Sequence, residues 1–80
     1  MEYIATFYSH FGAVRFKKIC EETGITAKAM PVPRLLSSSC GTCVRFQAEP
    51  ETVPSPTEET EQIVRVNGGA FEVLWRAADS

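Results

Sequence analysis

The chain opens with a strand pattern that passes through one serine into a helix pattern. Residues 3–8 are aromatic, β-branched or small and hold no breaker, which predicts a short, largely buried strand. Ser9 stands where the N-cap of a helix belongs. Apolar residues then recur at spacings of three and four: Phe11, Ala13, Val14, Phe16, Ile19 and Cys20. Gly24 and Ile25 suit the left-handed residue and the apolar residue that end a helix in a Schellman motif.

The middle of the chain predicts two strands joined by a loop that carries two thiols. Residues 26–32 alternate in polarity until Pro31 and Pro33 remove backbone donors, which is typical of an edge strand. Residues 35–43 hold small hydroxyls, a glycine and two cysteines without periodicity, and this composition predicts a loop. The alternation that returns over residues 44–47 predicts the third strand.

An acidic, proline-rich connection over residues 48–56 leads to a helix start signal. Residues 55–58 read Ser-Pro-Thr-Glu, with a cap serine, a proline at the first helical position and a glutamate three residues after the serine. This box predicts a second helix over residues 57–67, in which Ile63 and Val64 form the buried stripe.

The end of the chain predicts a last strand over residues 71–75 and a frayed tail over residues 77–80. An alternative replaces the second helix by a β-hairpin, in which residues 63–66 pair with the last strand across the turn signal Asn67-Gly68. We favour the helix because two residues match the positions of a capping box.

These elements follow the order β-α-β-β-α-β in a single domain over residues 1–80, since a chain of this length has room for one core. That order predicts an α+β, ferredoxin-like fold, an antiparallel sheet with two helices on one face. In this topology the loop between the second and third strands lies at the same end of the sheet as the start of the first helix. We therefore expect Cys40 and Cys43 to face Ser9 and His10.

Charge and hydropathy exclude several classes of partner. The formal net charge of −2 offers no field for nucleic-acid phosphates or anionic lipid. No run of about 18 apolar residues is present to cross a bilayer, and the polar, charged N-terminus does not resemble a secretory signal. We expect a cytoplasmic protein that binds neither nucleic acid nor membrane. The odd count of three cysteines argues against a disulfide framework.

The Cys40-Gly41-Thr42-Cys43 segment is the strongest chemical signal in the chain. A helix N-terminus and nearby basic residues favour the thiolate form of a cysteine, which is its nucleophilic form. Predicted supporting residues are Ser38, Ser39, Gly41, Arg34 and Arg45, and His10 is the candidate proton acceptor. The alternative is a pair of cysteines that only fills a half-buried loop.

A zinc site is not expected. Cys20, Cys40, Cys43 and His10 are the fewest ligands that could close one, and Cys20 lies about 15 Å along the predicted helix from His10. We expect Cys20 in the core, and no metal or other cofactor.

The segments Met30-Pro31-Val32-Pro33-Arg34 and Ser37-Ser38-Ser39-Cys40-Gly41, with the strand and helix before them, resemble a family of very short bacterial proteins described as putative selenium or sulfur carrier-like. The resemblance covers about residues 3–47 closely. It implies that Cys40 carries a persulfide or selenopersulfide. The family pattern has an aliphatic or small residue at the position of Cys43, which leaves a dithiol variant open.

The resemblance and the local chemistry together predict a carrier rather than a stand-alone enzyme. Cys40 would accept sulfur or selenium from a donor such as a cysteine desulfurase and pass it to an unknown acceptor. Cys43 would act as a resolving thiol, and we predict a Cys40–Cys43 disulfide under mild oxidation. Two rivals stay open: a small binding or regulatory module with incidental cysteines, and a Cys-x-x-Cys thiol-disulfide redox protein.

Overall fold

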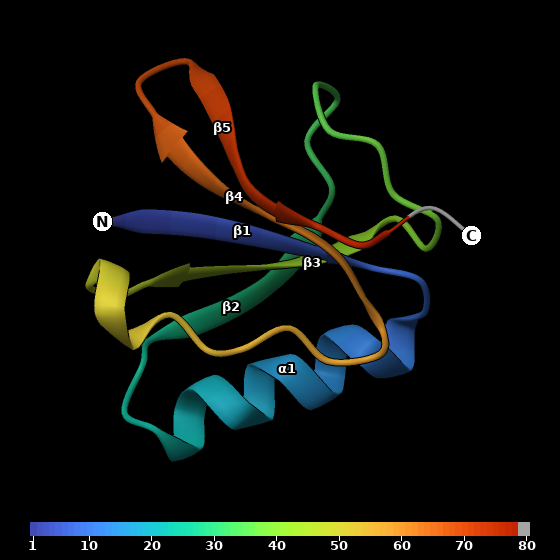
Figure 1. Ribbon diagram of the computed structural model, residues 1–80. Coiled ribbons are helices and arrows are strands. Elements are labelled where there is room, and N and C mark those ends of the chain that lie inside the picture. The colour runs from blue at the N-terminus through green and yellow to red at the C-terminus, as the bar shows by residue number, and fades with distance from the viewer. Residues whose placement is uncertain (79–80) are drawn as a thin grey trace.

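The computed structural model describes residues 1–78 and contains one five-stranded sheet (Figure 1). The elements in chain order are β1 (Glu2–Phe7), α1 (His10–Glu22), β2 (Ala27–Pro31), β3 (Thr42–Gln47), a 3-10 turn (Pro50–Thr52), β4 (Thr60–Asn67) and β5 (Ala70–Arg76). The strands lie in the order β2-β3-β1-β4-β5, and every neighbouring pair is antiparallel. The α+β class and the antiparallel sheet are confirmed.

Helix α1 begins and ends where the sequence predicts. The Ser9 hydroxyl accepts a hydrogen bond from the backbone N–H of Gly12 at 3.2 Å, which makes Ser9 the N-cap. At the other end, the Ile25 N–H donates to the Cys20 carbonyl at 2.8 Å while Gly24 has a φ of 80°. This bond and the left-handed glycine form the predicted Schellman ending.

One stripe of α1 is buried, and it is narrower than the sequence pattern predicts. Gly12, Ala13, Phe16 and Cys20 face the sheet. Phe11 and Val14, which the periodicity also placed in the core, are 68% and 53% exposed. The predicted stripe was too wide because residues 11–14 complete a full turn, so they cannot all face the sheet.

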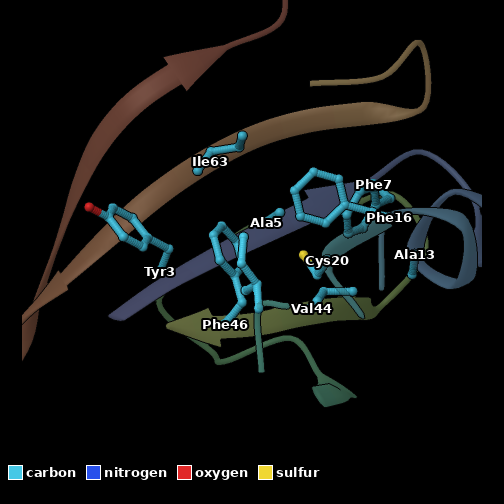
Figure 2. Close-up of a cluster of buried hydrophobic side chains, with 10 residues drawn as sticks. Tyr3, Ala5, Phe7, Ala13, Phe16, Cys20, Val44, Phe46 and Ile63 are labelled. Atoms are coloured by element: carbon cyan, nitrogen blue, oxygen red, sulfur yellow. The ribbon is translucent and has the colours of Figure 1, made fainter. Parts of the chain in front are cut away.

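The main core lies between α1 and the sheet (Figure 2). Its centre is Phe16, whose ring lies 5.4 Å from that of Phe7 and 5.5 Å from that of Phe46, both as tilted pairs. The remaining buried members are Tyr3, Ala5, Ala13, Cys20, Ile25, Val44 and Ile63. We call these ten residues the helix-face core.

The predicted second helix over residues 57–67 is wrong, and the hairpin alternative is correct. Residues 60–67 form β4, which pairs with β1 on one side and with β5 on the other. The capping box does not form, because the Thr57 N–H donates to the Thr60 hydroxyl at 2.9 Å instead. Gly68, with a φ of 64°, makes the left-handed turn between β4 and β5. Within residues 1–78, α1 is the only α-helix, so the ferredoxin-like arrangement with two helices is not found.

The acidic connection takes the place of a second helix beside α1. We call residues 48–59 the strap, and Ala48 and Val53 of this strap pack against the helix-face core. Its end is held at the start of α1, where the Tyr8 N–H donates to the Glu59 carbonyl at 2.9 Å. The helix side of the sheet is therefore covered by α1 and the strap (Figure 1).

The opposite face of the sheet has a smaller cluster. Ile4, Cys43 and Val64 are its buried members, with half-buried Met30, Val32, Leu36, Val66 and Phe71 packed around them. Val32 and Leu36 belong to residues 32–41, which we call the cysteine loop and which rises on this side of the sheet (Figure 1).

No helix in residues 1–78 has both the length and the apolar character needed to span a membrane. In the tail predicted to fray over residues 77–80, the Ala77 N–H donates to the Glu61 carbonyl at 2.8 Å, and residues 79–80 lie outside the described part of the chain.

Candidate functional site

The two thiols of the Cys-x-x-Cys segment pack against different faces of the sheet. Cys40 lies in the cysteine loop, is half-buried and packs against the helix-face core. Cys43 lies on β3, is fully buried and belongs to the cluster on the opposite face. Both are free thiols. The two thiols thus belong to different apolar clusters, and the Cys40–Cys43 disulfide stays a prediction.

The separation arises because β3 begins earlier than the sequence predicts. The strand starts at Thr42 instead of Val44, so Cys43 is a strand residue. Side chains alternate along a strand, and Val44 and Phe46 point to the helix-face core. Cys43 therefore points away from α1, and the expectation that it faces Ser9 and His10 is wrong.

The backbone around Cys40 holds its thiol at an open turn. The Cys40 Sγ donates to the Thr42 carbonyl at 3.3 Å, and the Cys40 N–H donates to the Ser38 hydroxyl at 3.4 Å. Gly41 has a φ of 75°, a conformation that favours glycine. A Cβ built at Gly41 would meet nothing within 4 Å, so the turn beside the thiol is open to an approaching group.

Two serines fasten the cysteine loop to the sheet. The Ser38 hydroxyl donates to the Phe7 carbonyl at 3.2 Å, at the end of β1. The Ser39 hydroxyl and N–H donate to the Glu61 carboxylate, at 2.6 Å for the hydroxyl. Because β1 leads through Ser9 into α1, the loop lies at the end of the sheet where α1 starts, as the topology argument predicted.

Glu59 supplies a carboxylate at the N-terminus of α1. The Ser9 hydroxyl donates to the Glu59 Oε2 at 2.9 Å. A carboxylate at this position compensates the partial positive charge of the helix start. The helix start therefore stabilises a thiolate less than the sequence suggests. Glu59 fell within the predicted second helix and had no predicted role.

Neither the predicted basic residues nor His10 forms a hydrogen bond with a thiol in the described part of the chain. Arg45 lies on β3, where it forms an ion pair with Glu2, and this contact raises the pKa of Arg45. Arg34 and His10 are exposed, and within residues 1–78 neither forms a hydrogen bond with a thiol. The hydrogen-bond partners of Cys40 are thus a serine hydroxyl and a backbone carbonyl.

The other two cysteines are held in the neutral form. Burial raises the pKa of Cys43 from 9.0 to about 11, with a smaller contribution from the nearby Cys40, while Arg45 lowers it. Burial likewise raises the pKa of Cys20 to about 11, with Glu21 adding to the effect. Cys20 lies in the helix-face core, as predicted. Three or more His, Cys, Asp or Glu side chains do not gather as a metal site anywhere in residues 1–78.

Sequence reasoning missed two acceptors that shape the site, the Glu61 carboxylate and the Thr42 carbonyl. Glu61 lies in a run of glutamates that looks uniformly solvated, and only the pairing of β4 with β1 brings it to the loop.

Comparisons with known proteins find one family. The family model described as "Putative Se/S carrier protein-like" matches residues 2–75. No curated protein and no solved structure matches the chain.

Proposed function

The chain belongs to the putative Se/S carrier protein-like family, and on that premise we propose that it carries sulfur or selenium on Cys40. The observation that supports this proposal best is the contrast among the three cysteines. Cys20 and Cys43 are fully buried, whereas Cys40 is half-buried at a turn that is open on the side of Gly41. Only an accessible thiol can attack a sulfur atom on another protein.

The transfer is a single displacement at sulfur. The Cys40 thiolate attacks the terminal sulfur of a donor persulfide, R–S–SH. A bond forms between Cys40 Sγ and that sulfur while the S–S bond of the donor breaks. The donor leaves as the thiolate R–S⁻, and the proton stays on the transferred sulfur. Atoms and electrons balance without an added oxidant, and the same displacement applies to selenium in the terminal position.

The surroundings of Cys40 suit both its resting thiol and the approach of a donor protein. In the resting thiol, the Sγ–H donates to the Thr42 carbonyl at 3.3 Å. The Ser38 and Ser39 hydroxyls are next to the thiol in sequence, and both are anchored by contacts to the sheet. Fastening the loop in this way limits the entropy lost when a partner approaches.

The donor in this proposal is a protein that bears a persulfide, such as a cysteine desulfurase, and the acceptor is a second protein of unknown identity. Cys43 takes no part, because its side chain packs on the other face of the sheet and its pKa of about 11 keeps it protonated. The proposed protein is therefore a one-thiol carrier, unlike the two-thiol switch that the sequence suggests.

The test is mass spectrometry of the protein after incubation with a cysteine desulfurase and cysteine. We expect one extra sulfur atom, which tandem fragmentation places on Cys40. Cys40→Ala should abolish the adduct, and Cys20→Ala is the matched control that should keep it. Circular dichroism establishes that each variant is folded.

Cys43→Ala separates the one-thiol carrier from the dithiol alternative. A one-thiol carrier keeps the adduct on Cys40 and the same sensitivity to mild oxidation. An adduct that persists in Cys40→Ala, or no adduct on the native protein, rejects the carrier.

A further inference from the structure

The pairing of β1 with β4 contains one irregularity. The register is regular as far as Thr6↔Gln62. The next pair is Phe7↔Thr60, which leaves Glu61 as an extra residue on β4. An extra residue of this kind is a β-bulge, and a bulge re-aims the side chain that it carries. In a regular register Glu61 would oppose Phe7, whose ring is buried in the helix-face core. The bulge therefore keeps the Glu61 carboxylate out of a buried pair.

Residues at this bulge hold the three serines that precede Cys40. Each contact is a hydrogen bond: the Gln62 Nε2 donates to the Ser37 carbonyl at 3.3 Å, the Ser38 hydroxyl donates to the Phe7 carbonyl at 3.2 Å, and Ser39 donates to the Glu61 carboxylate. On the other side of Cys40, Thr42 begins β3. Cys40 and Gly41 thus lie between the anchored serines and the sheet.

The contact between Ser39 and Glu61 is the strongest of the three anchors. The Ser39 hydroxyl lies 2.6 Å from Glu61 Oε2, and the Ser39 N–H donates to Oε1 at 3.2 Å. Hydrogen bonds to an ionised carboxylate are shorter and about twice as strong as neutral ones, and the other two anchors are neutral. The backbone of Glu61 is itself held, because its carbonyl accepts from the Ala77 N–H at 2.8 Å.

Glu61 reaches the thiol only through Ser39. The Cys40 Sγ donates to the Thr42 carbonyl, and the Cys40 N–H donates to the Ser38 hydroxyl. No hydrogen bond joins Glu61 to Cys40 in the part of the chain that the structure describes. Any influence of Glu61 on the chemistry of Cys40 is therefore an influence on where the thiol lies.

We propose that Glu61 is a positioning residue for Cys40, which holds the cysteine loop through Ser39 in the arrangement from which the thiolate meets a persulfide on another protein. A displacement at sulfur needs aligned reacting atoms, and alignment that exists before the encounter saves entropy. The proposal rests on the proposed function, because sulfur transfer is the step that the alignment serves. The displacement itself, with its bonds and proton, stays as written for Cys40.

The experiment compares two rates at Cys40. The first is sulfur transfer from a persulfidated cysteine desulfurase, followed by mass spectrometry over a range of donor concentrations. The second is alkylation of Cys40 by iodoacetamide, a small reagent that needs no aligned partner. We expect Glu61→Ala to lower the transfer rate at saturating donor about tenfold. Alkylation should become about threefold faster, because a loosened loop exposes the half-buried thiol.

Three further variants separate position from charge and from folding. Glu61→Gln keeps an oxygen that accepts from Ser39, so the transfer rate should return to within about twofold of the native rate. Ser39→Ala keeps the carboxylate but loses the shorter contact, so both rates should change in the same direction as in Glu61→Ala, by a smaller factor. Glu58→Ala is the matched control. It removes an exposed carboxylate that forms no ion pair within residues 1–78, and both rates should be native.

Several outcomes overturn the proposal. An alkylation rate in Glu61→Ala that is unchanged or lower does so, whatever the transfer rate. An unchanged transfer rate in Glu61→Ala does so when the native protein accepts sulfur, and so does a Glu61→Gln variant that is as slow as Glu61→Ala. A native protein that accepts no sulfur rejects the carrier function instead. Faster alkylation of Glu61→Ala would then still show that Glu61 places Cys40, so the two failures are told apart.

Discussion

The two faces of the sheet differ in how thoroughly they are covered. The face toward α1 has a cluster of ten buried apolar residues with three interacting aromatic pairs, whereas the opposite face has a cluster of three buried apolar residues beneath a loop. Apolar area removed from water is the main source of stability, so the helix-face core provides most of it. The opposite face leaves half-buried apolar groups beside a shallow depression. The two faces of one sheet therefore contribute unequally to its stability.

Removing the centre of the helix-face core should have the largest effect. Phe16→Ala deletes a fully buried ring between two others and should cost about 3–5 kcal/mol of the free energy of unfolding. Because small domains have about 5–15 kcal/mol in total, the variant should be close to unfolding. Urea denaturation followed by circular dichroism measures this loss. A cost below 1 kcal/mol would contradict the assignment of stability to this face.

Alkaline pH should weaken both faces through one thiol on each. Folded Cys20 and Cys43 stay protonated to about pH 11, whereas an unfolded cysteine ionises near 9.0. The unfolded state therefore loses protons first, and stability falls as the pH rises from 9 to 11, by about 2 kcal/mol per thiol. Denaturation midpoints across this range measure the slope. Cys43→Ala should have a shallower slope than the native protein, and an unchanged slope would reject the raised pKa of Cys43.

Contact between α1 and the strap should make a helix-favouring substitution destabilising. Gly→Ala within a helix normally stabilises by about 1 kcal/mol. A Cβ at Gly12, however, would clash with Glu59 Cβ, so the strap must move away. We expect Gly12→Ala to lower the free energy of unfolding by about 1.5 kcal/mol, or several degrees of melting temperature. A rise in melting temperature would show that the strap yields easily.

The smallest expected effect is a gain on the thinly covered face. Thr6 is fully buried, and its hydroxyl has no hydrogen-bond partner among residues 1–78. Thr6→Val removes that unsatisfied group at similar volume and should stabilise by about 0.5–1 kcal/mol. Thr60→Val is the matched control, because the buried Thr60 hydroxyl accepts from the Thr57 N–H at 2.9 Å and its loss should destabilise. A loss of stability in Thr6→Val would mean that the hydroxyl is satisfied in solution.

The sequence alone determined the local features of this protein. The strand before Ser9, the cap itself and the glycine ending of α1 follow from residue types at fixed spacings, and each is confirmed. The loop that carries Cys40 is confirmed as well, although Cys43 lies on β3. These features depend on neighbours within about one turn of chain, which is why a single sequence reveals them. The family resemblance and the choice of Cys40 came from such a local motif as well.

The tertiary structure decided between the helix and the strand over residues 60–67. Both signals are present in the sequence, a capping box and a β-branched run with a turn after it. As a helix, this segment could not supply the strand that lies between β1 and β5. As β4 it pairs with β1 and β5. Ile63 and Val64 are buried on opposite faces of the sheet. The sequence therefore lacks the polar–apolar alternation of a strand that is buried on one face only.

The tertiary structure also determined which face of the sheet Cys43 takes relative to Cys40. Side chains on a strand alternate with a period of two, so the residue at which β3 begins sets which face Cys43 takes. Pairing with β1 and β2 starts β3 at Thr42, and this pairing opposes Cys43 to Thr6 and to Met30. No spacing within Cys-x-x-Cys encodes that choice, because it comes from partners more than ten residues away in the chain.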